Sequence, residues 1–130
     1  MSKDKEACTN KDPVKFCQMK DNMGDFAPNT LKAIRDLAPN FVDLIHEMDQ
    51  VILEAGAIDM KTKRLIALAC VCVRSCEDCV YPQAKVAKNY GASKKEILEA
   101  IHVAVLTAGV PSWSIAKKGI IQLFDEWDEE

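Results

Sequence analysis

The 130-residue chain contains no apolar run of the 18 or so residues that a membrane-spanning helix needs. Its first five residues, Met1 to Lys5, are polar and lack the apolar stretch of a signal peptide. The basic residues are scattered and the net charge is −3, so the electrostatic footprint of a nucleic-acid-binding protein is also missing. These absences predict a cytoplasmic protein whose partners include neither a membrane nor a nucleic acid.

A convincing strand or hairpin signal is missing as well. Apolar residues recur instead at helical spacing, in segments separated by Asn, Gly and Pro. A chain of this length, with 48% hydrophobic and 28% charged residues, can build one globular core but not two ordinary ones. We therefore predict an all-α fold, a single-domain bundle of five to six helices over residues 28–130, preceded by a polar arm over residues 1–27.

Short polar side chains mark where the predicted helices begin. In chain order these residues are Asn29, Asn40, Asp59, Glu77 or Asp78, Ser93 and Ser112. Glu96 follows Ser93 by three residues, which is the pattern of a capping box. The helix that begins at Asn40 carries an apolar row made of Phe41, Leu44, Ile45, Met48, Ile52 and Ala55. His46 falls outside this row and is expected at the surface.

Two predicted helices are apolar on nearly every side. One contains the run 65–73, and the other is almost wholly apolar from Ala100 onward, with small residues at Ala104, Thr107 and Ala108. A chain this small can hardly cover two such helices by itself. We therefore predict an obligate homo-oligomer, in which small residues allow close contact between helices.

Six cysteines are too few for a disulfide scaffold, and four of them lie between residues 70 and 79. Cys76 and Cys79 form a C-x-x-C pair. Pro82 is tolerated best near a helix start, so the helix that contains it should begin at Glu77 or Asp78. Cys79 then lies in the first turn, where free N–H groups and the helix dipole favour a thiolate and lower the thiol pKa.

Three interpretations of these cysteines compete. Cys76 and Cys79 can be a redox dithiol. Together with Cys70 and Cys72 they can instead hold zinc or an iron–sulfur cluster. Against this, cysteines on one continuous helix are distributed along its axis and do not converge on a single point. Cys70 and Cys72 can also be small buried apolar side chains, which is the interpretation that we prefer for them. The other two cysteines, at positions 8 and 17, are expected to be incidental thiols, and we expect no metal and no other cofactor.

Three stretches resemble one superfamily. Residues 58–69, the Cys76-x-x-Cys79 pair and residues 91–104 are similar to the carboxymuconolactone decarboxylase and alkyl hydroperoxidase D-like superfamily. The resemblance is strong over residues 57–110. It implies an all-helical fold that assembles as trimers or hexamers.

The resemblance also identifies two supporting positions. Peroxidase-type members of the superfamily carry a glutamate twelve residues before the first cysteine and a histidine four residues after the second, which relay a proton to the attacking thiol. Arg64 and Gln83 occupy these positions here, and neither is a base near pH 7. Arg64 and Gln83 can still stabilise a thiolate through charge and an amide N–H. His102 is a further candidate site residue, although we expect a core or interface histidine.

We therefore predict a thiol–disulfide oxidoreductase that reduces protein or small-molecule disulfides with electrons from a thiol donor. The resemblance implies that Cys79 joins the partner and that Cys76 resolves the mixed disulfide; the reverse order, as in thioredoxin-like sites, stays open. Three alternatives remain. They are an alkyl hydroperoxide reductase or peroxiredoxin-linked antioxidant protein, a gamma-carboxymuconolactone decarboxylase-type enzyme, and a non-enzymatic metal-binding or assembly module.

Overall fold

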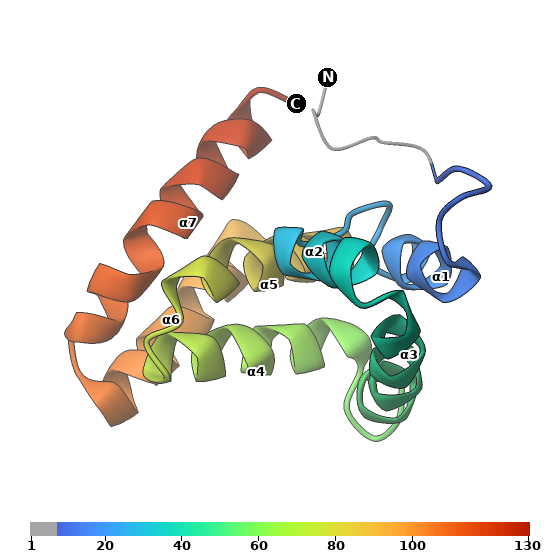
Figure 1. Ribbon diagram of the computed structural model, residues 1–130. Coiled ribbons are helices and arrows are strands. Elements are labelled where there is room, and N and C mark those ends of the chain that lie inside the picture. Colours follow the sequence, from blue (N-terminus) through green and yellow to red (C-terminus); the bar gives the residue numbers. More distant parts are fainter. Residues whose placement is uncertain (1–7) are drawn as a thin grey trace. The chain divides into compact units, whose positions relative to one another are not determined.

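The computed structural model describes residues 8–130, and these residues form helices and connecting turns without a strand (Figure 1). The seven helices of this part are α1 Val14–Asn22, α2 Asn29–Leu37, α3 Pro39–Leu53, α4 Met60–Val73, α5 Glu77–Asn89, α6 Lys94–Ala108 and α7 Pro111–Asp128. The all-α prediction is confirmed. The helix count exceeds the predicted five to six because α1 forms inside the segment that we expected to be a polar arm. Residues 1–7 of that arm lie outside the described residues.

None of the helices in residues 8–130 combines the length and the apolar character that a bilayer crossing requires. The chain divides into two compact units, Met1–Gly56 and Ala57–Glu130. The boundary predicted at residue 28, between an arm and a domain, stays a prediction.

In the first unit, α1 and α2 both pack on α3. Phe16 and Met19 of α1 are buried. The guanidinium of Arg35, on α2, lies 4.7 Å from the centre of the Phe16 ring, and its Nη1 atom lies 3.6 Å from Oδ1 of Asp12. Arg35 therefore links α2 to α1 and to the turn before α1 through a cation–π contact and an ion pair.

Helix α3 turns an unexpected face inward. Val42 and His46, one helical turn apart, are buried, and only 2% of His46 is exposed. The predicted apolar row is largely exposed instead, with 60% for Leu44 and 53% for Met48. The prediction that His46 lies at the surface is therefore wrong. Helical spacing shows which residues share a face, but not whether this chain covers that face.

The second unit contains α4 to α7, and its core is formed where these helices meet. The fully buried apolar side chains include Leu68, Val80, Ile97, Ile101 and Leu123. The predicted caps of two helices are confirmed. Asp59 accepts a hydrogen bond of 2.7 Å from the Thr62 N–H at the start of α4, and Ser93 and Glu96 form the capping box of α6.

The last helix begins differently from the prediction. Pro111 is the first residue of α7, and Val110 rather than Ser112 is the N-cap residue. Proline suits this position because its φ is already helical and the missing N–H would have no partner within the helix. Ser112 is buried inside the first turn, so the prediction that it caps α7 is wrong.

Helices α5 and α7 approach each other closely. A Cβ atom on Gly119 of α7 would lie 2.8 Å from the backbone nitrogen of Tyr81 on α5, so only glycine fits there. Two turns farther along α7, Glu126 accepts a hydrogen bond of 2.5 Å from the Tyr81 hydroxyl. The buried Lys85 places its Nζ 3.8 Å from the same Glu126 carboxylate. These contacts hold α7 against the first half of α5.

Replacing Ser93 by alanine should lower the free energy of unfolding by about 1 kcal/mol, because the variant loses the side chain that caps α6. In the protein, the Ser93 hydroxyl accepts from the Glu96 N–H at 3.1 Å, and Glu96 accepts from the Ser93 N–H at 2.7 Å. Urea unfolding followed by circular dichroism measures the loss. The exposed Ser114, which caps no helix, provides the matched control Ser114→Ala, which should leave the midpoint almost unchanged.

The same capping box should make stability sensitive to acid. The hydrogen bond from the Ser93 N–H and the neighbouring Lys61 hold the pKa of Glu96 below its ordinary value of 4.5. The unfolded chain therefore takes up a proton at a pH at which the folded protein does not. This contribution is present above pH 4.5 and is lost as the pH falls through the folded pKa. In Glu96→Gln the loss of stability below pH 4.5 should be smaller than in the wild type, and an equal loss would contradict the role of Glu96.

Candidate functional site

The turn between α4 and α5 carries the Cys76–Cys79 segment. Two hydrogen bonds close the end of α4: the Ser75 N–H donates to the Cys72 carbonyl at 3.2 Å, and the Cys76 N–H donates to the Val71 carbonyl at 3.0 Å. This is the Schellman pattern, in which one residue adopts a left-handed backbone. Ser75 is that residue, with φ 62°. The motif reverses the chain and delivers Cys76 to the start of α5.

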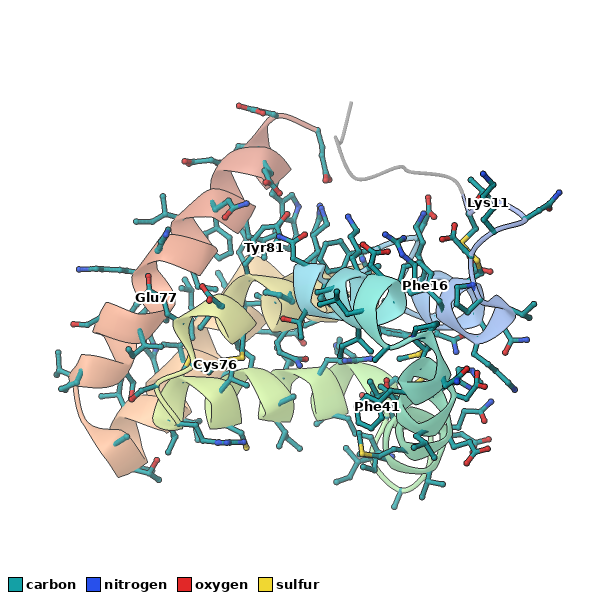
Figure 2. All side chains as sticks on the ribbon, viewed as in Figure 1. Lys11, Phe16, Phe41, Cys76, Glu77 and Tyr81 are labelled. Atoms are coloured by element: carbon teal, nitrogen blue, oxygen red, sulfur yellow. A yellow bond between two sulfur atoms is a disulfide. The ribbon has the colours of Figure 1, made fainter. Side chains whose placement is uncertain are left out.

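Cys76 is the N-cap residue of α5, and Cys79 lies in the first turn, as the sequence predicted. The Cys79 N–H donates to the Cys76 carbonyl at 3.1 Å. The two residues are joined by a disulfide with a Cα–Cα distance of 5.3 Å, within the usual range. Figure 2 shows Cys76 and Glu77 at this turn, where the chain enters α5. Cysteine at these two positions can therefore form a disulfide without distorting the helix.

Both cysteines of the pair are partly exposed, so a partner thiol or disulfide can approach them. Glu77 and Asp78 in the first turn of α5 and Arg74 at the end of α4 are exposed around the pair. Within residues 8–130, neither Cys76 nor Cys79 belongs to a group of three side chains that could hold a metal ion. The two sulfur atoms are bonded to each other and partly exposed, which is the arrangement of a dithiol–disulfide pair.

Arg64 and Gln83 lie next to each other, although 19 residues separate them in the sequence. The Arg64 Nη1 atom donates to the Gln83 Oε1 atom at 3.4 Å, across the interface between α4 and α5. Arg64 is buried to 8% exposure, and Gln83 lies one helical turn after Cys79. The structure thus places both supporting residues side by side on the helices that flank the cysteine pair.

His102 is exposed on α6, which excludes the first of the two expected positions, a core or an interface. Its ring lies 5.7 Å from the ring of Trp113, at a tilt of 59°. This contact joins α6 to the first turn of α7. An interface role for His102 stays a prediction.

The remaining cysteines of the 70–79 stretch differ from each other. Cys72 is buried in the core of the second unit, as expected, and burial raises the pKa of its thiol. Cys70 is exposed, so the prediction that it is buried is wrong. Residues 70 and 72 point to different sides of α4 because two residues are about half a helical turn apart. A buried thiol with a raised pKa is a poor nucleophile, which leaves Cys72 a packing residue.

Cys8 and Cys17 are bonded to each other rather than incidental thiols. The structure joins them by a disulfide with a Cα–Cα distance of 6.1 Å. Spacing alone did not predict this pair, because the turn that brings Cys8 back to α1 depends on hydrogen bonds between Thr9 and Asp12.

The contacts that hold α7 beside the cysteine pair were also missed in the sequence. Tyr81, Lys85 and Glu126 converge across α5 and α7. The sequence gives only a weak indication of this contact. Tyr81 and Lys85 are four residues apart and so share a face of α5, and Lys85 is a charged residue within the otherwise apolar buried stretch 84–87. The partner, Glu126, lies in an acidic C-terminal stretch that looks fully solvated. These three residues link α5 to α7.

Residues 39–118 match the carboxymuconolactone decarboxylase family. An uncharacterized protein, MJ0742, from Methanocaldococcus jannaschii is 32% identical over 89 residues, which cover 68% of this chain and 86% of that protein. Uncharacterized protein 4 in the cox locus of Paracoccus denitrificans is 35% identical over 86 residues, 66% of this chain and 77% of that protein.

Two crystal structures share the fold. One is a Burkholderia xenovorans protein described provisionally as a carboxymuconolactone decarboxylase; its TM-score is 0.74 at 21% identity, covering 88% of this chain and 89% of that one. The other is lpg0406 from Legionella pneumophila, a carboxymuconolactone decarboxylase family protein, with a TM-score of 0.65 at 26% identity and coverage of 88% and 97%. The similarity extends over most of each chain.

Proposed function

The chain belongs to the carboxymuconolactone decarboxylase family, and from that premise and the Cys76–Cys79 pair we propose that it is a thiol–disulfide oxidoreductase. It reduces disulfides in proteins or small molecules with electrons from a thiol donor. The observation that supports the proposal most strongly is the partly exposed disulfide between Cys76 and Cys79 at the start of α5.

The reaction has two balanced halves. A donor dithiol reduces the Cys76–Cys79 disulfide, so that the donor becomes a disulfide and the two cysteines become thiols. One cysteine thiolate then attacks the target disulfide, forms a mixed disulfide and releases the first target thiol. The other cysteine attacks the mixed disulfide, releases the second target thiol and restores the Cys76–Cys79 disulfide. Two electrons and two protons pass from donor to target.

This chemistry needs a thiolate but no dedicated base. The N-terminal end of a helix favours the thiolate through its free N–H groups and its dipole. Cys79 in the first turn of α5 has this position. Arg64 contributes a positive charge beside Gln83, and neither residue exchanges protons near pH 7. Disulfide exchange is therefore favoured over a peroxidase mechanism that depends on a Glu–His relay.

Wild-type protein should accelerate the reduction of insulin disulfides by dithiothreitol, which is seen as earlier precipitation of the insulin B chain. Serum albumin at the same thiol concentration serves as the control. A rate equal to that of dithiothreitol alone would overturn the proposed function. A decarboxylase of this family would not need the two cysteines. A lactone-decarboxylation activity that survives in the double variant Cys76→Ser/Cys79→Ser would therefore favour that alternative.

We also propose that the protein works as a homo-oligomer. Large apolar side chains are exposed at the end of α2, on α3 and around the end of α6. They are Leu37, Phe41, Leu44, Met48, Val51 and Ile52 in the first unit and Val103, Leu106 and Val110 in the second. An exposed apolar surface of this kind commonly marks a protein interface. We propose that further copies of the same chain bind to these exposed apolar residues and bury them.

Replacing Leu44 by glutamate should convert the oligomer to the 14.4 kDa monomer, because a charge would have to be buried in the interface. Size-exclusion chromatography with light scattering measures the mass. Gln50→Glu adds the same charge to the opposite, exposed side of α3 and should keep the wild-type mass. A wild type that elutes as a monomer at micromolar concentration would contradict the proposal.

A further inference from the structure

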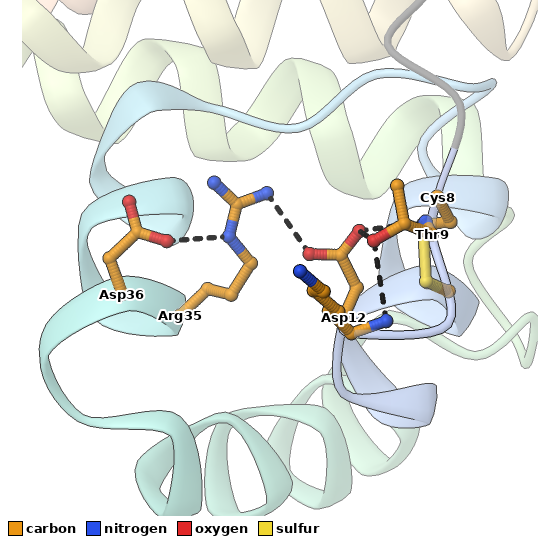
Figure 3. Close-up of polar contacts among 7 residues, drawn as sticks. Cys8, Thr9, Asp12, Arg35 and Asp36 are labelled. Carbon is orange, nitrogen blue, oxygen red and sulfur yellow. Dashed lines mark hydrogen bonds and ion pairs between the residues drawn. A yellow bond between two sulfur atoms is a disulfide. The ribbon is translucent and has the colours of Figure 1, made fainter.

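A second group of reactive side chains lies in the first unit, outside the site described above. The sulfur atoms of Cys8 and Cys17 and a carboxylate oxygen of Asp12 all lie within 4.8 Å of one another (Figure 3). This is the one such group of three found in residues 8–130. Cys8 is exposed and the other two residues are partly exposed, so small molecules and ions have access to the group.

A short turn creates this arrangement. The Asp12 N–H donates to the Thr9 carbonyl at 3.0 Å, and the Thr9 N–H donates back to the Asp12 Oδ2 atom at 2.9 Å. Cys17 is fixed in the first part of α1, where its N–H donates to the Pro13 carbonyl at 3.2 Å. The turn and the helix together bring residues that are nine positions apart to the same place.

Arg35 holds the carboxylate from the other side. Its Nη1 atom lies 3.6 Å from the Asp12 Oδ1 atom, while Oδ2 faces Thr9. The Thr9 N–H and Arg35 together fix the orientation of the Asp12 carboxylate.

Charge decides which states of this group are stable. With both cysteines as thiolates, three negative charges would lie close together, opposed by the positive charges of Arg35 and Lys20 near Asp12. Such crowding is unfavourable unless the thiols keep their protons or a cation binds. A disulfide removes both thiolate charges, and a divalent cation compensates for them. The protonated dithiol, the disulfide and the metal-bound dithiolate therefore all avoid the repulsion, and only the metal-bound form keeps both thiolates.

The ligand set suits zinc. Thiolates select soft or borderline metals over magnesium and calcium. With Zn–S bonds of about 2.3 Å, tetrahedral coordination separates two thiolate sulfurs by roughly 3.8 Å, a distance compatible with this group. Two thiolates and one carboxylate leave the fourth position for water. We propose that Cys8, Cys17 and Asp12 form a redox-gated site, which holds a disulfide when oxidised and one Zn²⁺ ion when reduced.

The switch between the states is balanced. The zinc-bound thiolates of Cys8 and Cys17 react with a small disulfide and two protons, giving the Cys8–Cys17 disulfide, two small thiols and free Zn²⁺. The small disulfide gains the two electrons that the cysteines lose. The reverse reaction needs a small thiol and Zn²⁺. This site lies in a different unit from Cys76 and Cys79 and does not depend on the function proposed for that pair.

Cobalt titration tests the proposal with a visible probe. The full chain with Cys70, Cys76 and Cys79 replaced by serine is reduced, freed of thiol and titrated anaerobically with Co²⁺. We expect thiolate-to-cobalt absorption that saturates at one equivalent and disappears when Zn²⁺ is added. The same protein, oxidised with glutathione disulfide, should show no such absorption. A reduced protein that gives no absorption would overturn the proposal.

Two further variants, made in the same background, test the contributions of the two cysteines and of Asp12 to metal binding. Cys8→Ser/Cys17→Ser should abolish the absorption, with helix content by circular dichroism as the check on folding; unchanged absorption would overturn the site. Asp12→Asn should weaken Co²⁺ binding by at least the roughly 10-fold to 100-fold that changes next to a metal site cost. Unchanged affinity in Asp12→Asn would remove the carboxylate from the ligand set and contradict the three-ligand proposal.

Discussion

Replacing either Cys76 or Cys79 by serine is expected to reduce insulin-disulfide reduction to the rate of dithiothreitol alone. Each cysteine is needed once in every turnover, because one forms the mixed disulfide and the other resolves it. Serine keeps the size of the side chain but neither forms a disulfide nor attacks one. The loss should therefore be complete in both single variants, and the double variant should lose no more than either of them.

Cys70→Ser is the matched control for this experiment. Cys70 is an exposed free thiol near the end of α4, six residues before Cys76, and should be dispensable. Full activity in both Cys76→Ser and Cys79→Ser would contradict the proposed function. Loss of activity in Cys70→Ser would mean that a third thiol takes part in turnover.

The two single variants also determine which thiol attacks. If Cys79 attacks, as its place in the first turn of α5 suggests, Cys76→Ser should accumulate a mixed disulfide with the target. With Cys70 also replaced by serine in both variants, Cys79→Ser should then trap almost none. Non-reducing mass spectrometry of the protein after reaction with a small aromatic disulfide measures both. Trapping in Cys79→Ser alone would assign the attack to Cys76.

Replacing Gly119 by leucine is expected to lower the free energy of unfolding by about 3 kcal/mol, the upper part of the usual range for overpacking. A Cβ atom on Gly119 would lie 2.8 Å from the Tyr81 backbone nitrogen and 3.2 Å from a methyl carbon of Val80. The backbone of α5 cannot yield as the end of a flexible side chain can. Helix α7 must therefore move away from α5, which weakens the core contacts of Ile120 and Leu123.

Gly56→Leu provides the matched comparison. No atom lies within 4 Å of a Cβ built on Gly56, so leucine there should change the free energy of unfolding by no more than about 0.5 kcal/mol. Urea unfolding of the two variants and the wild type measures the difference. Equal stability of Gly119→Leu and Gly56→Leu would contradict the close packing of α5 and α7.

Local signals in the sequence predicted most of the helix boundaries. Capping was predictable at Asp59, Ser93 and Glu96, because each side-chain oxygen accepts a hydrogen bond from an N–H group no more than three residues away. Such a contact does not depend on the rest of the fold. The start of α5 was predictable for a similar reason, since Pro82 restricts where that helix can begin. The position of Cys76 and Cys79 at that start follows directly.

Contacts between distant segments were harder to predict. The apolar row of α3 identifies a face correctly, but in this chain a neighbouring side, with Val42 and His46, is buried. The Arg64–Gln83 contact joins residues on two helices, and only the family resemblance indicated that these positions belong together. The Cys8–Cys17 disulfide depends on a turn whose hydrogen bonds leave a faint pattern in the sequence.

The most direct test of the account is an equilibrium redox titration of the Cys76–Cys79 pair. It uses a variant with Cys8, Cys17 and Cys70 replaced by serine and with the buried Cys72 retained. Mixtures of reduced and oxidised dithiothreitol or glutathione set the potential, and thiol alkylation followed by mass spectrometry counts the free sulfurs. We predict one reversible two-electron transition, in which the dithiol-to-disulfide ratio changes tenfold for every 30 mV or so. A pair that stays reduced, or stays oxidised, across the whole range would contradict a catalytic dithiol.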